Sequence, residues 1–405
     1  MAEKNWKKYL NLLQRQHKFW IIVSCAVASG FFFVLGIYPR LGSVGALLSA
    51  DAEQRGLLPF RESVIAEPLK PKHVETPEAV KAIYMTSWVA ATPKWRAELV
   101  DFVKKTEINS IIIDVKDYTG MITFDTKNDI IKAEGSEEIR VKDMRDFIEV
   151  LHDAGIYTIA RITVFQDPFY SKKHPDIAVQ KKNGTLWKDR KGLSYIDPGA
   201  GQYWDYIVDV ARATEAAGFD ELNFDYIRFP SDGNMSDIVF PVSGVRAKNK
   251  PEVLNDFFAY LHKELREGEN ALPTPISADV FGMTTSNFDD LNIGQVLEPI
   301  AKYFDFVAPM VYPSHYPATF HGFKNPAEHP YEIVLFAMSE GVKRLQAPTS
   351  TPLKLRPWLQ DFDLGADYGP VEVRAQIQAT YDAGLTSWMI WDPSNKYTRG
   401  AYEIE

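Results

Sequence analysis

A stretch near the middle of the chain combines the pattern of a buried strand with groups that can transfer protons. Residues 218–230 read GFDELNFDYIRFP, with an apolar and aromatic centre typical of a buried β-strand. Asp225 and Arg228 lie near the C-terminal end of this run, and Pro230 stops further strand pairing. Charged side chains beside a buried strand cost free energy unless a site requires them. The stretch therefore predicts the catalytic strand of a barrel enzyme.

Carboxylates follow other apolar runs of the chain in the same way. Asp279 ends the next strand-like run in an otherwise apolar setting. Two carboxyl groups facing one bond, one ionised and one protonated, are the chemistry of glycoside hydrolysis. We therefore expect Asp225 to act as nucleophile or base and Asp279 as general acid, with Asp117 and Asp392 in reserve.

The two-residue period of a strand predicts which side chains share a face. Asn223, Asp225 and Ile227 fall on one face of their strand. By the same rule, Asp114 and Lys116 share a face, as do Ser277 and Asp279. Arg161 and Arg228 are the expected counter-charges, since a nearby cation lowers the pKa of a carboxylate and keeps it ionised.

Aromatic side chains at the ends of predicted strands indicate what could bind there. Trp88, Trp358 and Trp391 could provide flat platforms for sugar rings, or could simply close the end of a barrel as apolar plugs. Tyr312, beside Pro313, could donate a hydrogen bond to a substrate. With Asp114, Lys116, Asp117, Arg161, Arg228 and Asp392, these aromatic residues form the predicted substrate-binding set.

The elements that must position these groups alternate between two periodicities. Eight β-rich runs are separated by seven amphipathic stretches, which predicts a (β/α)8 TIM barrel whose eighth helix is missing or rudimentary. A doubly wound open sheet is the alternative, but no glycine-rich dinucleotide fingerprint follows any strand. The predicted strands are Ala82–Thr86, Ser110–Val115, Ile156–Ile162, Glu221–Phe229, Ile276–Phe281, Phe304–Val311, Leu353–Leu359 and Ser387–Trp391. The predicted helices are Pro93–Thr106, Val141–Ala154, Gln202–Ala217, Pro251–Glu267, Ile293–Tyr303, Glu332–Gln346 and Val371–Ala383.

The N-terminal part has a different composition from the rest. Residues 1–18 carry five basic residues against Glu3, and the 20 residues Phe19–Tyr38 contain no charge. This length suits a transmembrane signal-anchor, and the preceding positive charges place residues 1–18 in the cytoplasm. A cleaved signal peptide, with a site near Val44-Gly45-Ala46, is the alternative. Residues 39–78 are rich in proline and charge and predict an extended linker, followed by a barrel at 79–405 outside the cytoplasm.

Composition narrows the possible partners. The net charge is −9 over 405 residues, and because the N-terminal tail is basic the main body is still more acidic. A nucleic-acid partner is therefore not expected. The only cysteine is Cys25, and the histidines of the main body have no metal-ligand spacing, so neither a metal nor a cofactor is expected.

Seven segments of the main body, in matching order, resemble the bacterial glycoside hydrolase domain family, an extracytoplasmic family with a TIM-barrel-like fold. The resemblance covers about residues 79–395 and implies a sugar hydrolase without naming the sugar. The segments are KAIYMTSWVAATP (81–93), IIIDVKDYTG (111–120), GIYTIARITVFQDP (155–168), LWKDRKGLSYIDP (186–198), GFDELNFDYIRFPSDG (218–233), FVAPMVYPSHY (306–316) and WMIWDP (388–393).

A more distant similarity is to family 18 chitinases, whose fourth strand carries the pattern D-x-x-D-x-D-x-E. Asp220, Asn223 and Asp225 stand in the first three places, but Ile227 stands where the chitinases have the catalytic glutamate. Met310 and Tyr312 match the M-x-Y pair of the sixth strand. The resemblance implies either an acid contributed by another strand or a barrel that binds carbohydrate without cutting it.

Overall fold

The computed structural model describes residues 72–245, 250–346 and 350–404. The predicted cytoplasmic tail, the signal-anchor Phe19–Tyr38 and most of the predicted linker lie outside these residues. Among the helices within them, none combines the length and apolar character needed to span a bilayer.

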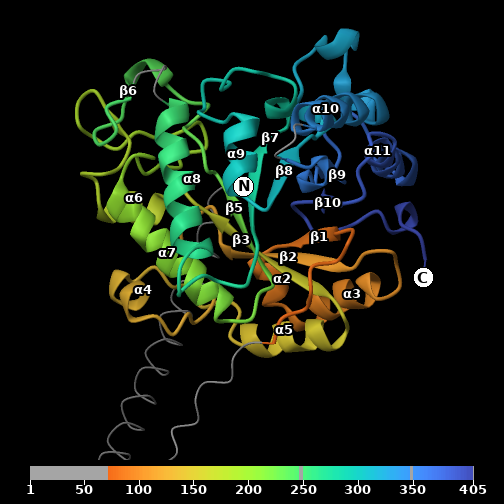
Figure 1. Cartoon of the computed structure of the whole chain (residues 1–405), viewed down its shortest axis with the longest axis horizontal. Coiled ribbons are helices and arrows are strands. Elements are labelled where there is room, and N and C mark those ends of the chain that lie inside the picture. Colours follow the sequence, from red (N-terminus) through yellow and green to blue (C-terminus); the bar gives the residue numbers. More distant parts are fainter. Residues whose placement is uncertain (1–71, 246–249, 347–349, 405) are drawn as a thin grey trace, which may run out of the picture. The chain divides into compact units, whose positions relative to one another are not determined.

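Eight parallel strands form a closed barrel at the centre of the molecule (Figure 1). Their order around the barrel is β1-β10-β9-β8-β7-β5-β3-β2, so neighbours in sequence are neighbours in space. This confirms the predicted TIM barrel. The strands are β1 (Lys81–Met85), β2 (Ser110–Lys116), β3 (Tyr157–Thr163), β5 (Glu221–Asp225), β7 (Ile276–Phe281), β8 (Phe306–Met310), β9 (Trp358–Gln360) and β10 (Trp388–Trp391).

Helices between successive barrel strands surround the barrel. After β10 the described chain has only the 3-10 turn Arg399–Ala401, which agrees with the prediction that the eighth helix is missing or rudimentary. Short helices and a small antiparallel pair, which the sequence pattern did not predict, lie in the connections. The larger helices are α3 (Pro93–Val103), α5 (Met144–Asp153), α7 (Gly201–Glu215), α8 (Lys250–Arg266), α9 (Leu297–Tyr303), α10 (Pro330–Leu345) and α11 (Pro370–Asp382). The additional elements are α2 (Ser87–Ala90), α4 (Asp129–Glu134), α6 (Pro168–Lys173), β4 (Gln180–Lys181) and β6 (Ile238–Val239).

Strand alternation divides the buried residues into two layers. In β1, Ala82 and Tyr84 belong to the cluster inside the barrel, whereas Ile83 and Met85 belong to the layer between the barrel and the helices. The helices cover this outer layer with apolar stripes. In α5 the buried side chains recur at the helical spacing of three and four residues. This inside–outside division determines which polar side chains can meet in the barrel mouth.

The fourth barrel strand is shorter than predicted. β5 ends at Asp225 because Tyr226 has a φ of 53°, in the left-handed region, and breaks the strand. The prediction that Ile227 shares one strand face with Asn223 and Asp225 is therefore wrong. Ile227 is instead fully buried in the outer layer.

A bulge in β2 overturns a second expectation. Asp114 pairs with Arg161 of β3, but Lys116 pairs with the next residue, Ile162, so Val115 is an extra residue. Lys116 consequently points outward and pairs with Asp167 at 2.7 Å. Asp114 and Lys116 thus face opposite sides of the barrel wall.

The described end of the predicted linker is packed against the barrel. The backbone N–H of Val74 donates to Asp220 at 2.8 Å, and the hydroxyls of Thr76 and Tyr157 are 3.1 Å apart. His73 contacts Asp220 at 3.4 Å, and the pKa of His73 rises to about 9 because Asp220 and Glu215 accept its hydrogen bonds. Residues 72–78 therefore pack against the barrel, within the compact unit Lys70–Glu405.

Candidate active site

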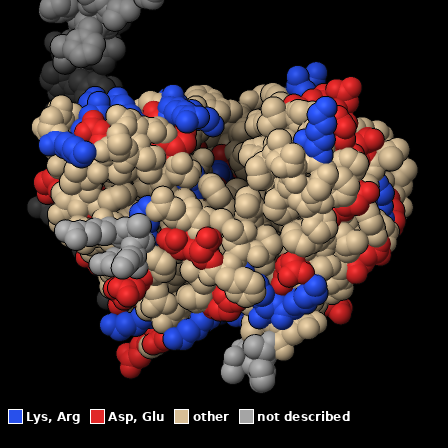
Figure 2. Space-filling view, turned by 90° about the horizontal axis from the view of Figure 1, so that it is seen from above, with Lys and Arg blue, Asp and Glu red and all other residues tan. Residues whose placement is uncertain are grey.

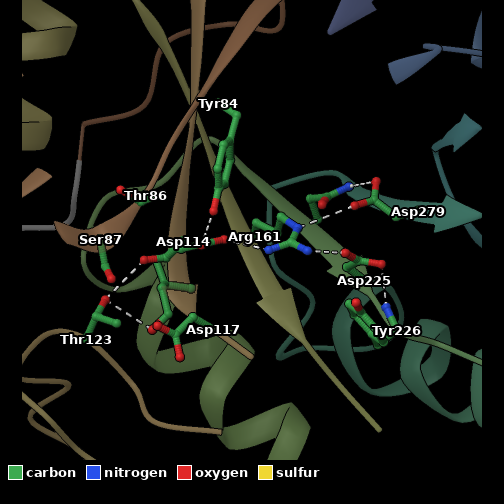
Figure 3. A network of polar contacts seen from close by, with 12 residues as sticks. Tyr84, Thr86, Ser87, Asp114, Asp117, Thr123, Arg161, Asp225, Tyr226 and Asp279 are labelled. Atoms are coloured by element: carbon green, nitrogen blue, oxygen red, sulfur yellow. Dashed lines mark hydrogen bonds and ion pairs between the residues drawn. The ribbon is translucent and has the colours of Figure 1, made fainter. Parts of the chain in front are cut away.

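Arg161 of β3 is the centre of a charged network that spans four neighbouring strands (Figure 3). Its Nη1 donates to Asp114 of β2 at 2.7 Å, and its Nη2 donates to Asp225 of β5. Its Nε is 3.7 Å from Asp279 of β7. All four side chains are buried, so the guanidinium is the main compensation for three carboxyl groups withdrawn from water.

Asp225 uses both of its carboxylate oxygens. Oδ2 accepts the hydrogen bond from Arg161, and Oδ1 accepts the backbone N–H of Tyr226 at 2.6 Å. Charge-assisted hydrogen bonds of this kind favour the ionised form of a carboxyl group. The left-handed turn at Tyr226 therefore both ends β5 and supplies a donor to the predicted nucleophile.

Asp279 is the group whose protonation is most altered by its surroundings. Burial, and then the negative charge of Asp225, raise its pKa from 3.8 to about 8, although Arg161 opposes the shift. Its Oδ1 accepts hydrogen bonds from Trp358 Nε1 at 2.8 Å and from Asn223 Nδ2 at 3.0 Å. Because Oδ1 is engaged by two donors, Oδ2 is the oxygen that would carry a proton.

The register of the strands places these two carboxyl groups side by side. Asn223 pairs with Ser277, and Phe224 pairs with Ala278. The next residues along the two strands are Asp225 and Asp279, and adjacent strands are about 4.8 Å apart. One guanidinium contacts both groups, which is consistent with such close placement.

Asp114 is held on the other side of Arg161. The hydroxyl of Tyr84 donates to its Oδ2, and burial raises the pKa of both groups. The ring of Tyr84 stacks on Trp391 with centroids 4.0 Å apart, and Trp391 lies over the Arg161 guanidinium at 5.0 Å. Asp114 thus fixes the orientation of Arg161. Asp114 itself does not line the pocket.

A pocket of about 440 Å³ opens above this network. Of the predicted residues, it is lined by Asp225, Asp279, Arg161, Arg228, Tyr312, Trp358 and Trp391. One face of the molecule is visibly hollowed, with acidic and basic side chains at the bottom of the hollow (Figure 2). On the same face, charges of both signs are interspersed.

Four predicted binding residues lie elsewhere. Trp88 is 57% exposed and packs under Arg140, whose guanidinium is 4.4 Å from the ring centre. Asp117 pairs with Arg140 and accepts the Thr119 N–H, so it orders its own turn. Asp392 accepts backbone N–H groups of the loop that follows β10. Lys116 points away from the barrel interior because of the bulge.

The expected role of Arg228 also changes. Its Nη1 donates to the Phe229 carbonyl at 3.0 Å and to Ser231 Oγ at 3.1 Å. Within the described ranges, no carboxylate lies at ion-pair distance from it. Arg161 alone is therefore the counter-ion of Asp225.

The pocket also contains residues that the sequence pattern did not identify. Except for Phe281, the last residue of β7, they lie beyond the strand ends, where alternation gives no information about direction. Tyr226 and Phe281 follow Asp225 and Asp279 so closely that their position in the sequence could have identified them. The residues missed are Lys191, Tyr226, Phe281, Gly282, Met283, His315 and Tyr316. Among the described residues, no cluster of three or more histidine, aspartate or glutamate side chains could hold a metal ion.

Residues 82–397 match the family model described as "Putative glycosyl hydrolase domain". The chain belongs to this family. No match was found among curated proteins.

Two solved structures share the fold of this glycosyl hydrolase domain. The PgaB (BpsB) glycoside hydrolase domain from Bordetella bronchiseptica is 16% identical, with a TM-score of 0.53, covering 82% of this chain and 100% of that one. An α-L-fucosidase isoenzyme 2 from Paenibacillus thiaminolyticus is 11% identical, with a TM-score of 0.54, covering 80% and 48%. A hypothetical protein from Ruminiclostridium thermocellum is 31% identical over 49% of this chain and 97% of its own, with a TM-score of 0.44. At 16% and 11% identity, the first two likenesses show the fold alone.

The structure also explains the departure from the chitinase pattern. The residue in the glutamate place, Ile227, lies beyond the left-handed turn at Tyr226 and is buried in the outer layer. Asp220, in the first place of the pattern, lies at the base of the barrel, where it accepts hydrogen bonds from Thr158 and contacts His152 at 2.9 Å. In this member of the glycosyl hydrolase family, any acid that works with Asp225 must come from another strand.

Proposed function

We propose that this chain is a glycoside hydrolase that cleaves a polysaccharide with Asp225 and Asp279. The observation that carries the proposal is the difference between two adjacent carboxyl groups. Asp225 is hydrogen-bonded to a guanidinium and a backbone N–H, whereas the raised pKa of Asp279 keeps it protonated near neutral pH. Two carboxyl groups whose surroundings separate their protonation states have the acid and base roles that glycoside hydrolysis requires.

The roles follow from these states. Asp279 would donate its proton to the oxygen of the leaving sugar as the glycosidic bond breaks. Asp225 would attack the anomeric carbon, and the ionised Asp279 would then activate water to release the second product. Both carboxyl groups contact the one Arg161 guanidinium, and such close placement favours a retaining mechanism, because a small separation leaves no room for a water between nucleophile and sugar.

The aromatic side chains around the carboxyl groups support a carbohydrate substrate. Trp391 and Trp358 line the pocket with ring centroids 5.6 Å apart and nearly perpendicular planes. Trp358 also donates its indole N–H to Asp279, so its orientation is fixed. Tyr312 lines the same pocket and could hydrogen-bond a sugar hydroxyl.

The activity is tested by incubating the purified barrel unit, residues 70–405, with polysaccharides and chromogenic glycosides. We expect product release that Asp225→Asn and Asp279→Asn each reduce by at least about a hundredfold, the usual contribution of a positioned acid or base. Product release at the wild-type rate by either variant would remove that residue from the mechanism. Proton NMR should show that the first product released has the same anomeric configuration as the bond that was cleaved.

We also propose that the barrel is held at the outer face of the cell membrane by Phe19–Tyr38. The support is the uncharged length of this segment and the basic residues before it. The full chain should sediment with membranes, and protease added to intact cells should digest the barrel. Recovery of the full chain in the soluble fraction would contradict the anchor.

One observation favours the alternative of a carbohydrate-binding barrel without catalysis. Both oxygens of Asp225 already accept a hydrogen bond, which lowers their nucleophilicity. Glycan binding without turnover, unchanged by Asp279→Asn, would establish this alternative.

A further inference from the structure

The lining of the pocket has a charge balance opposite to that of the whole protein. Arg161, Arg228 and Lys191 line it, against the two carboxyl groups Asp225 and Asp279. Three cations thus face two carboxyl groups, and the raised pKa of Asp279 keeps one of these protonated, although the chain as a whole carries a net charge of −9. Arg161 is neutralised by the network in the pocket floor, which leaves Arg228 and Lys191 as the cations that a ligand would meet.

Arg228 is a buried cation that lines the pocket. It is only 8% exposed, and its guanidinium is 4.7 Å from the ring centre of Phe281 and 5.0 Å from that of Tyr226. Only its Nη1 has hydrogen-bond partners among the described residues, and both partners are uncharged. A guanidinium withdrawn from water without a counter-ion is costly. Its planar fork matches a carboxylate, which it can bind with two parallel hydrogen bonds.

Other polar groups of the pocket are also available to bind a ligand. The hydroxyl of Tyr316 is buried and lacks a hydrogen-bond partner among the described residues. It lies beside Gly282, where a Cβ would be only 2.8 Å from the Tyr316 oxygen. Lys191 is exposed at the pocket edge, and after burial its charge is the second cause that lowers the pKa of His315. Lys191 and His315 are therefore close to each other in the same pocket.

We propose that this pocket is a subsite for a sugar that carries a carboxylate, such as a uronic acid or a carboxyalkyl-substituted residue. Arg228 pairs with the carboxylate, Lys191 attracts it at the entrance, and the Tyr316 hydroxyl completes its hydrogen bonds. The inference rests on the proposed function and names the substrate class for the same site. A neutral sugar would leave the Arg228 guanidinium without a counter-ion, and a cationic amino sugar would be repelled.

The test is binding of the full chain to matched oligosaccharide pairs, measured by calorimetry. Each pair consists of oligogalacturonate, alginate or hyaluronan fragments and the same fragments with their carboxyl groups reduced to alcohols. In at least one pair, we expect the carboxylated member to bind about tenfold more tightly, with a difference that shrinks as salt is added. Equal binding within every pair, binding to no pair, or preference for sulfated, phosphorylated or amino sugars would overturn the subsite.

Two variants locate the contact. Arg228→Gln should abolish the preference for the carboxylated member, and Lys191→Gln should reduce it about threefold, as expected for an exposed charge. Lys188→Gln is the matched control, because Lys188 is an exposed cation of the same loop that does not line the pocket. If Arg228→Gln lowers the unfolding temperature, the exposed Lys191 decides the assignment. A preference unchanged by Lys191→Gln, or equally reduced by Lys188→Gln, would overturn it.

Failure of the proposed subsite and failure of the proposed hydrolase activity give different results. Carboxylate-selective binding without product release would keep the subsite and remove the hydrolase. Product release from neutral glycans, without selectivity in binding, would keep the hydrolase and remove the subsite.

Discussion

Replacing Asp279 by Asn should stabilise the fold while removing the proposed acid. The pKa of Asp279 is about 8 in the folded protein and about 4 in an unfolded chain. Between these values the folded state binds a proton that the unfolded state lacks, so stability falls as pH rises from about 4 to about 8 and is constant above. One pKa unit corresponds to about 1.4 kcal/mol, which gives a cost of up to about 4 kcal/mol at pH 7. Asn avoids this cost at every pH and keeps an oxygen to accept the hydrogen bonds of Trp358 and Asn223.

Urea denaturation of residues 70–405 at pH 5, 7 and 8.5 measures this effect. The variant should gain about 1–2 kcal/mol at pH 5 and progressively more at pH 7 and 8.5, because the wild-type protein loses stability over that range. Asp289→Asn is the control, since Asp289 is an exposed loop residue and its replacement should change the free energy of unfolding by less than about 0.5 kcal/mol. A gain that does not depend on pH, or a loss at every pH, would refute the reasoning.

Three further predictions concern the network and its surroundings. Trp391→Ala should weaken glycan binding about tenfold through loss of an aromatic platform, as measured by calorimetric titration with glycans. Trp88→Ala should leave glycan binding unchanged. Weaker binding by the Trp88 variant than by the Trp391 variant would exclude Trp391 as a platform. Arg161→Gln should lower the free energy of unfolding by about 3–5 kcal/mol in urea, because buried carboxyl groups lose their counter-ion, and an unchanged midpoint would contradict the network. The pKa of Asp220 is lowered to about 2, against burial, by hydrogen bonds from His152, His73 and the backbone, so wild-type stability should be lost as pH falls from about 4 to about 2. Acid titration followed by circular dichroism should show a smaller loss for Asp220→Asn.

The sequence pattern was sufficient to predict the barrel and the polar side chains that its strands point inward. Apolar runs of β-rich composition separated by amphipathic helices leave little choice of fold, and the rule that sites lie at the carboxyl ends of strands brought Asp225, Asp279 and Arg161 together. Alternation works wherever the strand is regular, since direction then depends only on counting residues.

The errors arise where the backbone departs from that regularity. Tyr226 adopts a left-handed conformation that its residue type does not favour, so β5 ends before Ile227. The extra residue Val115 reverses the direction of Lys116. The direction of Arg228 and the positions of Lys191 and Tyr316 depend on loop conformations that no periodicity describes. These features follow from tertiary packing, which local sequence does not encode.

The bulge in β2 has a consequence for how the length of this strand can vary. Without Val115, Lys116 would directly follow the inward-facing Asp114 and would still lie beside Ile162 on the outer face, where it pairs with Asp167. A single-codon deletion at this point would thus remove the bulge and leave the charge of the pocket floor unchanged. Related chains could therefore gain or lose one residue here without altering the charge of the sugars that they accept.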